Sequence, residues 1–479
     1  MKELDAIVVG SGPNGLAAAI VLARAGHSVK VLEGQPTIGG GARTMALTLP
    51  GFRHDLCSAI HPLAAASPFF RSLELGKHGV EFLFSPSSLA HPLDDGVAVL
   101  ERSVEATAAS LGPDEAAYLR LMKPLVRDFD EVMIPLMMNP VISLPKAPFR
   151  SAAFGLKALE SAFDFASDTF QNPLTRALFA GCAAHSFAPL TKPLTNAFSL
   201  ILASAGHAVG WPMIRGGSGA LIDGLAQVLK AAGGELEVNR PVHSLGALPA
   251  SRLVLFDTHA QVMERICADA LPDSYRKHVR EFRRGPGVFK LDYALRGPMP
   301  WKQAACLRAA TLHLGGTLEE ITESEAAVAD GRVPERPYVL VAQQSLFDDT
   351  RAPAGQHTLW AYCHLPNGST VDATAVIERQ LERFAPGFQD LVLARHVKSP
   401  RDFEDGNSSY VGGDISGGAV DELQSFFRPT LGMPYTTPNP RLLICSSSAP
   451  PGPGVHGMSG FHAASLALKR LEAASSSAP

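Results

Sequence analysis

The chain has 479 residues, which is long for a single hydrophobic core, so two or three intertwined domains are expected. Hydrophobic residues make up 46% and charged residues 18% of the chain, a composition that excludes a disordered protein. The net charge of -4, without a basic and aromatic-rich stretch, gives no electrostatic basis for nucleic acid as a partner.

The first segment with a clear pattern is a strand, turn and helix. An apolar run at residues 6–9 predicts a buried parallel strand, and the helical pattern 16–25 follows the glycine-rich sequence GSGPNG. Gly10 permits a tight turn, Gly12 lets backbone N–H groups approach a pyrophosphate, and Gly15 allows close helix packing. The predicted cofactor-binding residues of this turn are Gly10, Ser11, Gly12, Asn14 and Gly15.

A second predicted strand, residues 28–32, ends at Glu33. A carboxylate there can accept a hydrogen bond from a ribose 2′-OH, which argues against the 2′-phosphate of NADP. The sequence GGGART at residues 39–44 then adds backbone donors and a guanidinium, so Gly40, Gly41 and Arg43 are predicted at the diphosphate. The alternative is a glycine-rich surface loop with a solvated arginine.

A hairpin is predicted at residues 44–52, and it leads into His54, Asp55, Cys57 and His61. These four side chains fit the spacing of no familiar metal site, so a loop against the cofactor is favoured and no metal is predicted. The six cysteines contain no CxxC pair, which excludes dithiol-reductase and zinc-ribbon classes and indicates a reducing compartment.

Residues 103–205 are mostly helical in pattern and suggest a cap. The apolar patches 132–138 and 163–170 could line a substrate cavity or belong to ordinary core. The uncharged stretch 197–214 approaches membrane-spanning length, but its glycines and Pro212 favour a buried helix that leads to a turn.

The remaining elements return to α/β structure. Glycines around Arg215 open a helix at 220–232, and the last strand, 441–445, runs into a proline- and glycine-rich segment that begins the final helix, 459–471. Further strands are predicted at 235–238, 253–256, 289–295, 339–343, 357–363 and 391–397, and further helices at 262–270, 274–283 and 371–384. The later strands would form a mixed sheet that floors the cavity.

These segments resemble the phytoene desaturase-like branch of the FAD-dependent amine oxidase superfamily over essentially the whole chain. The resemblance rests on the glycine turn with Glu33, on Gly40 and Arg43, on the turn after Arg215, and on residues 451–464. Segments 285–292, 360–368 and 412–415 are similar to the subgroup named pyridine nucleotide-disulfide oxidoreductase domain-containing protein 2. A β-meander usual in desaturases is missing between residues 245 and 252, which weakens the transfer of a carotenoid substrate.

The resemblance implies a non-covalently bound FAD held by both ends of the chain. Gly10, Gly12, Gly15 and Arg43 would meet its pyrophosphate, Glu33 its adenosine ribose, and the backbone of Val242 its adenine. Beside the isoalloxazine would run Val455, His456, Gly457 and Met458. The final helix would point its N-terminus at the N1/C2 carbonyl edge, where a helix dipole stabilises an anionic reduced flavin.

The implied fold class is α/β. A Rossmann-like FAD-binding domain is assembled from residues 1–60, 205–285 and 400–479, and the substrate domain combines a mixed β-sheet with a helical cap. The cap is expected at residues 61–204 and the β-rich part at 286–399.

The expected activity is an FAD-dependent dehydrogenation or desaturation of a lipophilic substrate. A hydride would pass from a substrate C–H bond to flavin N5, and O2 or a quinone would reoxidise the flavin, because a single dinucleotide fingerprint supports no separate nicotinamide domain. His456 and Arg215 are the candidate catalytic residues. The alternative roles are a loop histidine bonded to backbone and an arginine that ties down the turn.

Two other function classes stay open: a flavin amine oxidase, and a flavin-binding regulatory or interaction protein with little turnover. Glu3 and Asp5 precede the first strand without the charged and apolar regions of a secretion signal, so a cytoplasmic location is expected. Peripheral membrane contact also stays open, because an interfacial helix of the cap would have the composition of a buried one.

Overall fold

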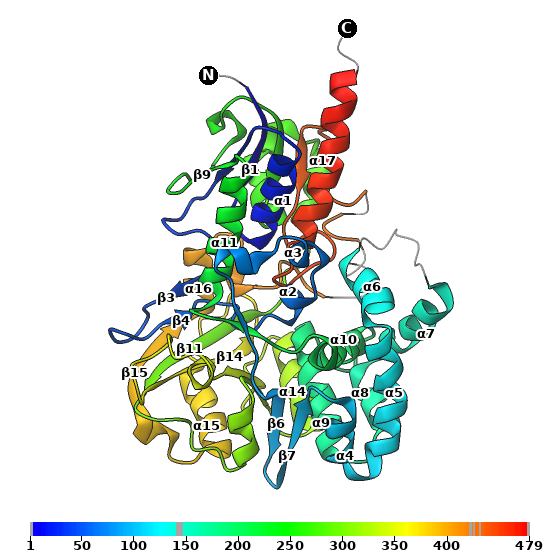
Figure 1. Ribbon diagram of the computed structural model, residues 1–479, viewed down its shortest axis with the longest axis vertical. Coiled ribbons are helices and arrows are strands. Elements are labelled where there is room, and N and C mark those ends of the chain that lie inside the picture. The colour runs from blue at the N-terminus through cyan, green and yellow to red at the C-terminus, as the bar shows by residue number, and fades with distance from the viewer. Residues whose placement is uncertain (1–2, 140–146, 421–423, 425–426, 431–432, 477–479) are drawn as a thin grey trace.

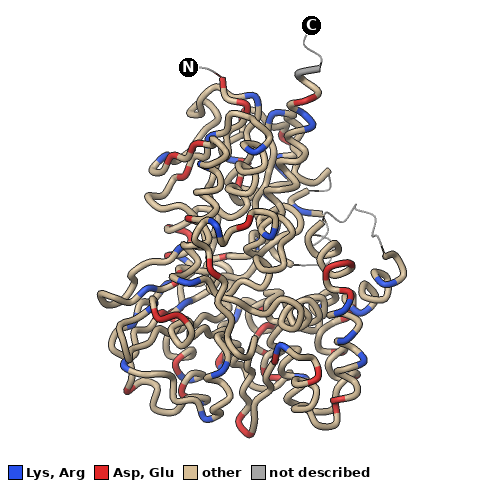
Figure 2. Tube along the Cα trace, in the orientation of Figure 1, with Lys and Arg blue, Asp and Glu red and all other residues tan. Residues whose placement is uncertain are grey.

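The computed structural model describes residues 3–139, 147–420, 424, 427–430 and 433–476. Within these residues the chain forms two main sheets in two stacked parts, with a group of helices beside the second (Figure 1). Both termini lie at the end of the molecule that holds the first sheet. Acidic and basic residues are interspersed along the trace, as Figure 2 shows.

The first sheet is parallel and is assembled from distant segments. Its strand order is β16-β10-β1-β2-β9. The strands are β1 (Leu4–Val9), β2 (Val29–Leu32), β9 (Glu235–Glu237), β10 (Ser251–Phe256) and β16 (Leu442–Ile444). The inner strand β1 is an almost continuous apolar run, as expected for a parallel strand covered on both faces.

Helix α1 (Pro13–Arg24) packs against the last helix, α17 (Met458–Ser476), and against α11 (Ser218–Ala231). The contact between α1 and α17 depends on Gly460, where an added Cβ would lie 1.8 Å from the carbonyl oxygen of Asn14. The first and last helices therefore approach each other at backbone distance, and the two ends of the chain share one core.

The second sheet is mixed, in the order β15-β11-β14-β13-β12-β6-β7. Its strands are β6 (Ser87–Leu93), β7 (Gly96–Glu101), β11 (Gly287–Leu295), β12 (Thr311–Leu314), β13 (Val339–Ala342), β14 (His357–Leu365) and β15 (Val392–Lys398). Neighbours pair antiparallel except β12 and β6. Helix α15 (Thr374–Phe384) packs its apolar side on this sheet.

The helical region lies beside the second sheet (Figure 1). It contains α4 (Val104–Ala109), α5 (Glu115–Arg127), α6 (Ile134–Met138), α7 (Pro148–Ala158), α8 (Ala162–Thr169), α9 (Pro173–Ala183) and α10 (Thr195–Ala208). The remaining helices are α2 (Pro62–Ala66), α3 (Pro68–Arg71), α12 (Ala260–Ile266), α13 (Asp273–Arg280), α14 (Leu318–Ala329) and α16 (Pro400–Gly406).

A short ladder between β3 (Thr44–Met45) and β4 (His54–Asp55) joins the two parts of the molecule; a second short ladder pairs β5 (Phe82–Leu83) with β8 (Met213–Ile214). Asp55 is fully buried and accepts hydrogen bonds from the backbone N–H of Ser218 at 2.8 Å and from Thr44 Oγ1 at 2.8 Å. Its other oxygen pairs with the buried Arg351 at 2.7 Å. This carboxylate therefore ties the start of α11 to the region that follows β13.

The α/β fold class predicted from the sequence is confirmed. The strands of the parallel sheet fall within the predicted segments 1–60, 205–285 and 400–479, while the exact domain boundaries stay a prediction. One difference lies in the region expected to be a helical cap, because β6 and β7 at residues 87–101 extend the mixed sheet. Pro92 and three polar residues interrupt the apolar pattern of β6, so it gives little strand signal.

The uncharged stretch 197–214 contains most of α10 and the strand β8. No helix among the described residues is long and apolar enough to cross a membrane. The prediction of a buried helix that leads to a turn is therefore confirmed, and α10 is buried in the helical region.

Candidate active site

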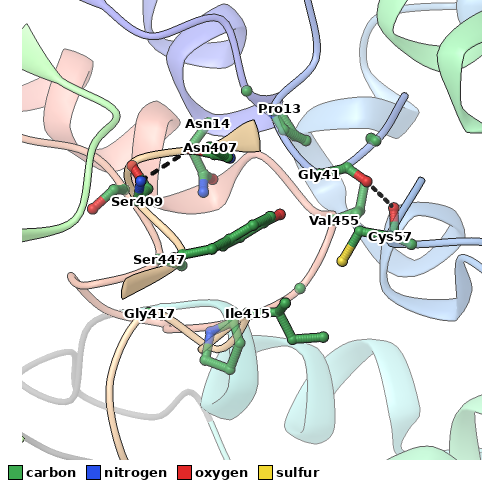
Figure 3. A pocket seen from close by; sticks show the side chains of 18 of the residues that line it. Pro13, Asn14, Gly41, Cys57, Asn407, Ser409, Ile415, Gly417, Ser447 and Val455 are labelled. Atoms are coloured by element: carbon green, nitrogen blue, oxygen red, sulfur yellow. Dashed lines mark hydrogen bonds between the residues drawn. The ribbon is translucent and has the colours of Figure 1, made fainter. Parts of the chain in front are cut away.

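A cavity of about 1050 Å³ lies between the two parts of the molecule. The glycine turn and the segment 450–455 both line it, although they are separated by more than four hundred residues in the sequence. Figure 3 shows Pro13 and Asn14 from the turn, Cys57 from the hairpin region and Val455 from the C-terminal segment around the same space. The two ends of the chain therefore meet at one cavity, as predicted.

We call the two ends of this cavity the turn end and the sheet end. The turn end is lined by residues 9–14, 32–35, 37, 40–43, 240–243, 257–259, 404–405 and 407–410. The sheet end is lined by His185, Phe187, Phe198, Trp211, Thr311, Leu340, Val341, Ala342, Trp360 and Tyr362.

The glycine turn at the turn end leaves no room for a side chain at its glycine positions. Gly10 has a φ of +101°, and a Cβ on Gly15 would lie 2.2 Å from the carbonyl oxygen of Gly10. The N–H of Gly15 donates to Asp257 Oδ2 at 2.9 Å. The turn thus holds the N-terminus of α1 open toward the cavity, which is the arrangement that favours a bound phosphate.

Glu33 lines the cavity at the end of β2 and is held by the turn itself. One carboxylate oxygen accepts from the backbone N–H of Ser11 at 3.0 Å and from its hydroxyl at 2.5 Å, and the other accepts from the N–H of Gln35 at 2.9 Å. The carboxylate is therefore fixed beside the turn, where it can still accept a ribose hydroxyl.

Arg43 lines the cavity next to Gly40 and Gly41. Its guanidinium donates to the carbonyl oxygens of Gly40 at 2.8 Å and Gly406 at 3.2 Å, and it makes no ion pair among the described residues. A mostly buried cation with only neutral acceptors fits an anionic ligand such as a diphosphate. The sequence alternative of a solvated surface arginine is therefore wrong.

Asp257 is a residue of the turn end that the sequence patterns did not bring to notice. It follows β10 directly and lies under the glycine turn, where a Cβ on Gly12 would be 2.5 Å from its Oδ2. Burial raises the pKa of Asp257 to about 7, and the negative charge of Glu33 adds to the increase. The sequence does contain a signal for Asp257: an acidic residue directly follows strand β10, as Glu33 directly follows β2.

His456, a predicted catalytic residue, is directed away from the cavity. Val455 lines the cavity, but the ring of His456 is buried in the protein, and its Nδ1 accepts the backbone N–H of Met458 at 3.0 Å. Burial lowers the pKa of His456 to about 4, so the ring is neutral. It is a loop histidine bonded to backbone, because the bend that exposes Val455 points the next side chain inward.

Arg215, the other predicted catalytic residue, is also outside the cavity. Its half-exposed guanidinium pairs with Asp349 at 2.7 Å and lies 3.8 Å from Glu81. The structure places it at the surface, where it supports the turn before α11. Arg215 lies outside the cavity because it stands directly before the turn at Gly216 and Gly217, and the cavity is lined by other segments.

The remaining predicted cofactor residues separate into two groups. Those that line the cavity are Gly10, Ser11, Gly12, Asn14, Glu33, Gly40, Gly41, Arg43, Val242 and Val455. Those that do not are Gly15, His456, Gly457 and Met458, although Gly15 shapes the turn and Met458 begins α17.

The apolar patches predicted for the substrate end have different outcomes. Leu136 and Met137, from the patch 132–138, line the cavity. The patch 163–170 is core instead: Phe165 and Phe170 are buried and pack on the ring of Phe179. Helical spacing alone does not distinguish these two cases.

The group at residues 54–61 lies partly against the cavity, and the described residues contain no cluster suited to a metal ion. Cys57 and His61 line the cavity, His61 Nε2 lies 2.9 Å from Ser218 Oγ, and Asp55 is in the ion pair with Arg351. The segment is therefore a loop against the cavity, and its contact with the cofactor stays a prediction.

Comparison with known proteins gives related sequences over the full length. Residues 8–73 match the family of NAD(P)-binding Rossmann-like domains. The chain is 26% identical over 556 residues to pyridine nucleotide-disulfide oxidoreductase domain-containing protein 2 of Rattus norvegicus, covering 98% of this chain and 94% of that protein. One of the limonene dehydrogenase subunits of Castellaniella defragrans is 29% identical over 140 residues, which are 28% of this chain and 25% of that protein.

Solved structures share the fold at low sequence identity. An oxidoreductase from Methanosarcina mazei aligns with a TM-score of 0.64 at 16% identity, covering 98% of this chain and 100% of the other. Cyclohexylamine oxidase from Brevibacterium oxydans aligns with a TM-score of 0.60 at 15% identity, covering 99% and 100%. An A394C mutant of putrescine oxidase gives 0.61 at 15%, covering 98% and 99%.

Proposed function

We propose that this chain, a member of the FAD-dependent oxidoreductase family, binds one FAD non-covalently and dehydrogenates or desaturates a lipophilic substrate in the manner of the phytoene desaturases. The observation that carries the proposal is the single cavity lined by the glycine turn, by Arg43 and by the C-terminal segment at Val455. When bound, FAD would supply a hydride acceptor for a substrate C–H bond, with O2 or a quinone as the later oxidant.

The residues of the turn end fit such a group. The turn at Gly10 and Gly12 presents the N-terminus of α1 to a diphosphate, and Arg43 offers the matching positive charge. Glu33 would bind the ribose and the backbone at Val242 the adenine. The chain's contribution at this end is binding and orientation.

The sheet end supports a lipophilic substrate. Phe187, Phe198, Trp211, Trp360 and Tyr362 line it, and such an aromatic lining would exclude water from the reacting bond. The name of the relative from Castellaniella defragrans, a limonene dehydrogenase subunit, is in keeping with a hydrocarbon substrate.

The test begins with purification and an absorption spectrum. We expect a yellow protein with FAD that acid or heat releases, since no covalent link is proposed. Anaerobic bleaching by polyenes or unsaturated lipids supports the proposal. A protein that stays colourless when incubated with FAD refutes it.

A flavin amine oxidase is the second candidate, because putrescine oxidase and cyclohexylamine oxidase share the fold. It would bleach with amines and release peroxide on reoxidation in air. A flavin that no substrate bleaches would instead indicate the third class, a binding or regulatory protein.

Peripheral membrane contact is part of the proposal, and α7 supports it. Phe149 is 90% exposed and Leu156, two helical turns later, is 71% exposed on the same helix. Sedimentation with phosphatidylcholine and phosphatidylglycerol vesicles tests this contact. The double substitution F149S/L156S should reduce the bound fraction, and an unchanged fraction would exclude α7 as the contact.

A further inference from the structure

We propose that His185 donates a hydrogen bond to the oxygen of a neutral, otherwise apolar substrate at the sheet end of the cavity. The inferred substrate class is a ketone, aldehyde, alcohol or ether of a hydrocarbon skeleton. The inference deepens the proposed function and rests on it in one respect: that the sheet end receives the substrate.

His185 lies at the cavity wall among aromatic rings. It follows α9 in a short 3-10 turn, and its ring meets the edge of Trp211 with the ring centroids 5.9 Å apart. Of its two nitrogens, Nε2 lies 3.0 Å from Nε2 of His313, and Nδ1 makes no hydrogen bond among the described residues. Although it has no hydrogen bond to the described residues, Nδ1 is not fully buried. Because His185 lines the cavity, we infer that this atom keeps accessible surface there.

The hydrogen bond between the two histidines fixes which nitrogen of His185 carries the proton. His313 is fully buried, and its Nδ1 has no hydrogen-bond partner in the described part of the chain. A buried N–H without an acceptor is rarer and costlier than a bare ring nitrogen, so the proton of His313 belongs on Nε2. His313 then donates to His185, whose own proton must be on Nδ1, the atom open to the cavity.

The two histidine rings behind His185, those of His313 and His91, are tightly packed against Gly181. His313 and His91 both crowd Gly181, where an added Cβ would lie 2.5 Å and 2.8 Å from their Nδ1 atoms. His91 Nε2 lies 2.9 Å from the carbonyl oxygen of Gly316 and can only donate to it, so its Nδ1 is also bare. Because Nδ1 carries no proton in either ring, both Nδ1 atoms can lie close to Gly181 without needing a hydrogen-bond acceptor there.

Phe187 fixes the cavity wall next to His185. It is held in a left-handed conformation with φ +57°, and its ring packs on the ring of His364 at a tilt, with the centroids 4.1 Å apart. His364 is in turn paired with the buried Glu325 at 2.7 Å. A residue held in a strained conformation and packed on an aromatic ring indicates a position that the surrounding structure determines tightly.

The charges around the cavity select a neutral partner for His185. The carboxylates that line the cavity within the described chain are Glu33, Asp257, Glu404 and Asp405, all at or near the turn end, and its arginines are Arg43, Arg240 and Arg265. An ammonium or carboxylate group at the sheet end would therefore be desolvated without an opposite charge. Burial lowers the pKa of His185 to about 3, which keeps its ring a neutral donor.

The experiment compares cyclooctanone, cyclooctane and cyclooctylamine, three ligands with one skeleton. Their Kd values are measured by anaerobic calorimetry on wild-type holoprotein and on H185F, H185Q and F198L. Wild type should bind cyclooctanone tighter than the other two. H185F should weaken cyclooctanone about five- to tenfold and cyclooctane less than about twofold, because one hydrogen bond is lost.

The remaining variants distinguish the effect of the hydrogen-bond donor from the effect of the shape of the cavity wall. H185Q keeps an N–H donor and should retain most of the preference for the ketone, whereas F198L should weaken all three ligands alike. H313L frees His185 to move its proton to Nε2, so the preference for the ketone should fall although His185 is present.

The proposal is overturned if wild type binds cyclooctane or cyclooctylamine as tightly as cyclooctanone, or if H185F keeps the wild-type ratio of ketone to hydrocarbon. The flavin content of each preparation is read separately from its absorbance. A colourless protein that still shows the ketone preference would refute the proposed function and leave the role of His185 intact.

Discussion

At the turn end of the cavity, most groups that could contact a ligand belong to the backbone or to carboxylates that directly follow a strand. At the sheet end, they are side chains brought together from the turn after α9, from α10 and from the strands β12–β14. The turn end carries ionisable groups, among them Arg43 and Glu33, whereas the sheet end presents uncharged ring nitrogens and aromatic faces. One cavity therefore offers an ionic site and an apolar site side by side.

The two ends should therefore respond differently to substitution. A backbone-built site fails when the backbone cannot approach the ligand, whatever the side chains do. A side-chain-built site changes its selectivity one group at a time. Single substitutions test this contrast.

Gly15→Ala should abolish FAD retention and destabilise the fold by about 1–3 kcal/mol. Its Cβ would meet the carbonyl oxygen of Gly10 at 2.2 Å, and that backbone is fixed by β1 and α1. FAD content after gel filtration and a urea unfolding curve check both effects. Gly155→Ala is the matched control, since its Cβ meets nothing within 4 Å. A stoichiometric FAD content in Gly15→Ala would contradict the tight-turn argument.

Arg43→Ala should weaken FAD binding about 10- to 100-fold, as expected for the loss of charge-assisted hydrogen bonds to a diphosphate. Arg43→Lys, which keeps the charge but not the planar fork, should fall between wild type and Arg43→Ala. Fluorescence titration of the apoprotein with FAD gives the Kd values. Equal affinity in all three proteins would show that Arg43 is not at the diphosphate.

Asp257 should make FAD binding sensitive to pH. Its raised pKa of about 7 keeps the carboxyl neutral in acid, and ionisation above pH 7 places a negative charge beside the glycine turn. The Kd for FAD should therefore rise severalfold between pH 6 and pH 8.5. Asp257→Asn keeps an acceptor for the N–H of Gly15 and should remove this rise. A variant with the wild-type pH profile would assign the effect to another group.

Arg215→Ala should have the smallest effect of this set. Its ion pairs are exposed, so the free energy of unfolding should change by less than about 0.5 kcal/mol, and FAD binding and flavin reduction should stay at wild-type values. Thermal unfolding and anaerobic reduction check this. A loss of flavin reduction with an unchanged Tm would restore Arg215 as a catalytic residue.

The contrast between the two ends also explains what could be predicted from the sequence. The turn end is encoded locally, because the strand, the glycines and Glu33 stand within 30 residues and each has a backbone reason to be there. Asp257 was missed although the same strand-end rule identifies it. The C-terminal segment was placed correctly at the cavity, but the direction of His456 depends on the bend of individual backbone residues.

The sheet end could not be predicted, because its residues meet only through the tertiary fold. His185 and His313 are 128 residues apart, and neither belongs to a local motif. The strands β6, β7 and β12 also escaped prediction, and β12 carries both His313 and Thr311. Without these strands in place, no spacing in the sequence indicates a pair of histidines at the cavity wall.

The contact between Gly460 and Asn14 has a consequence for biosynthesis. Strand β16 and helix α17 complete the sheet and cover α1, so the crevice around the glycine turn closes only after the ribosome has passed residue 460. Until then the nascent chain exposes the apolar face of its first helix. On the proposed function, nucleotide loading would therefore follow synthesis of α17, and a chain stopped ahead of α17 would be expected to engage chaperones.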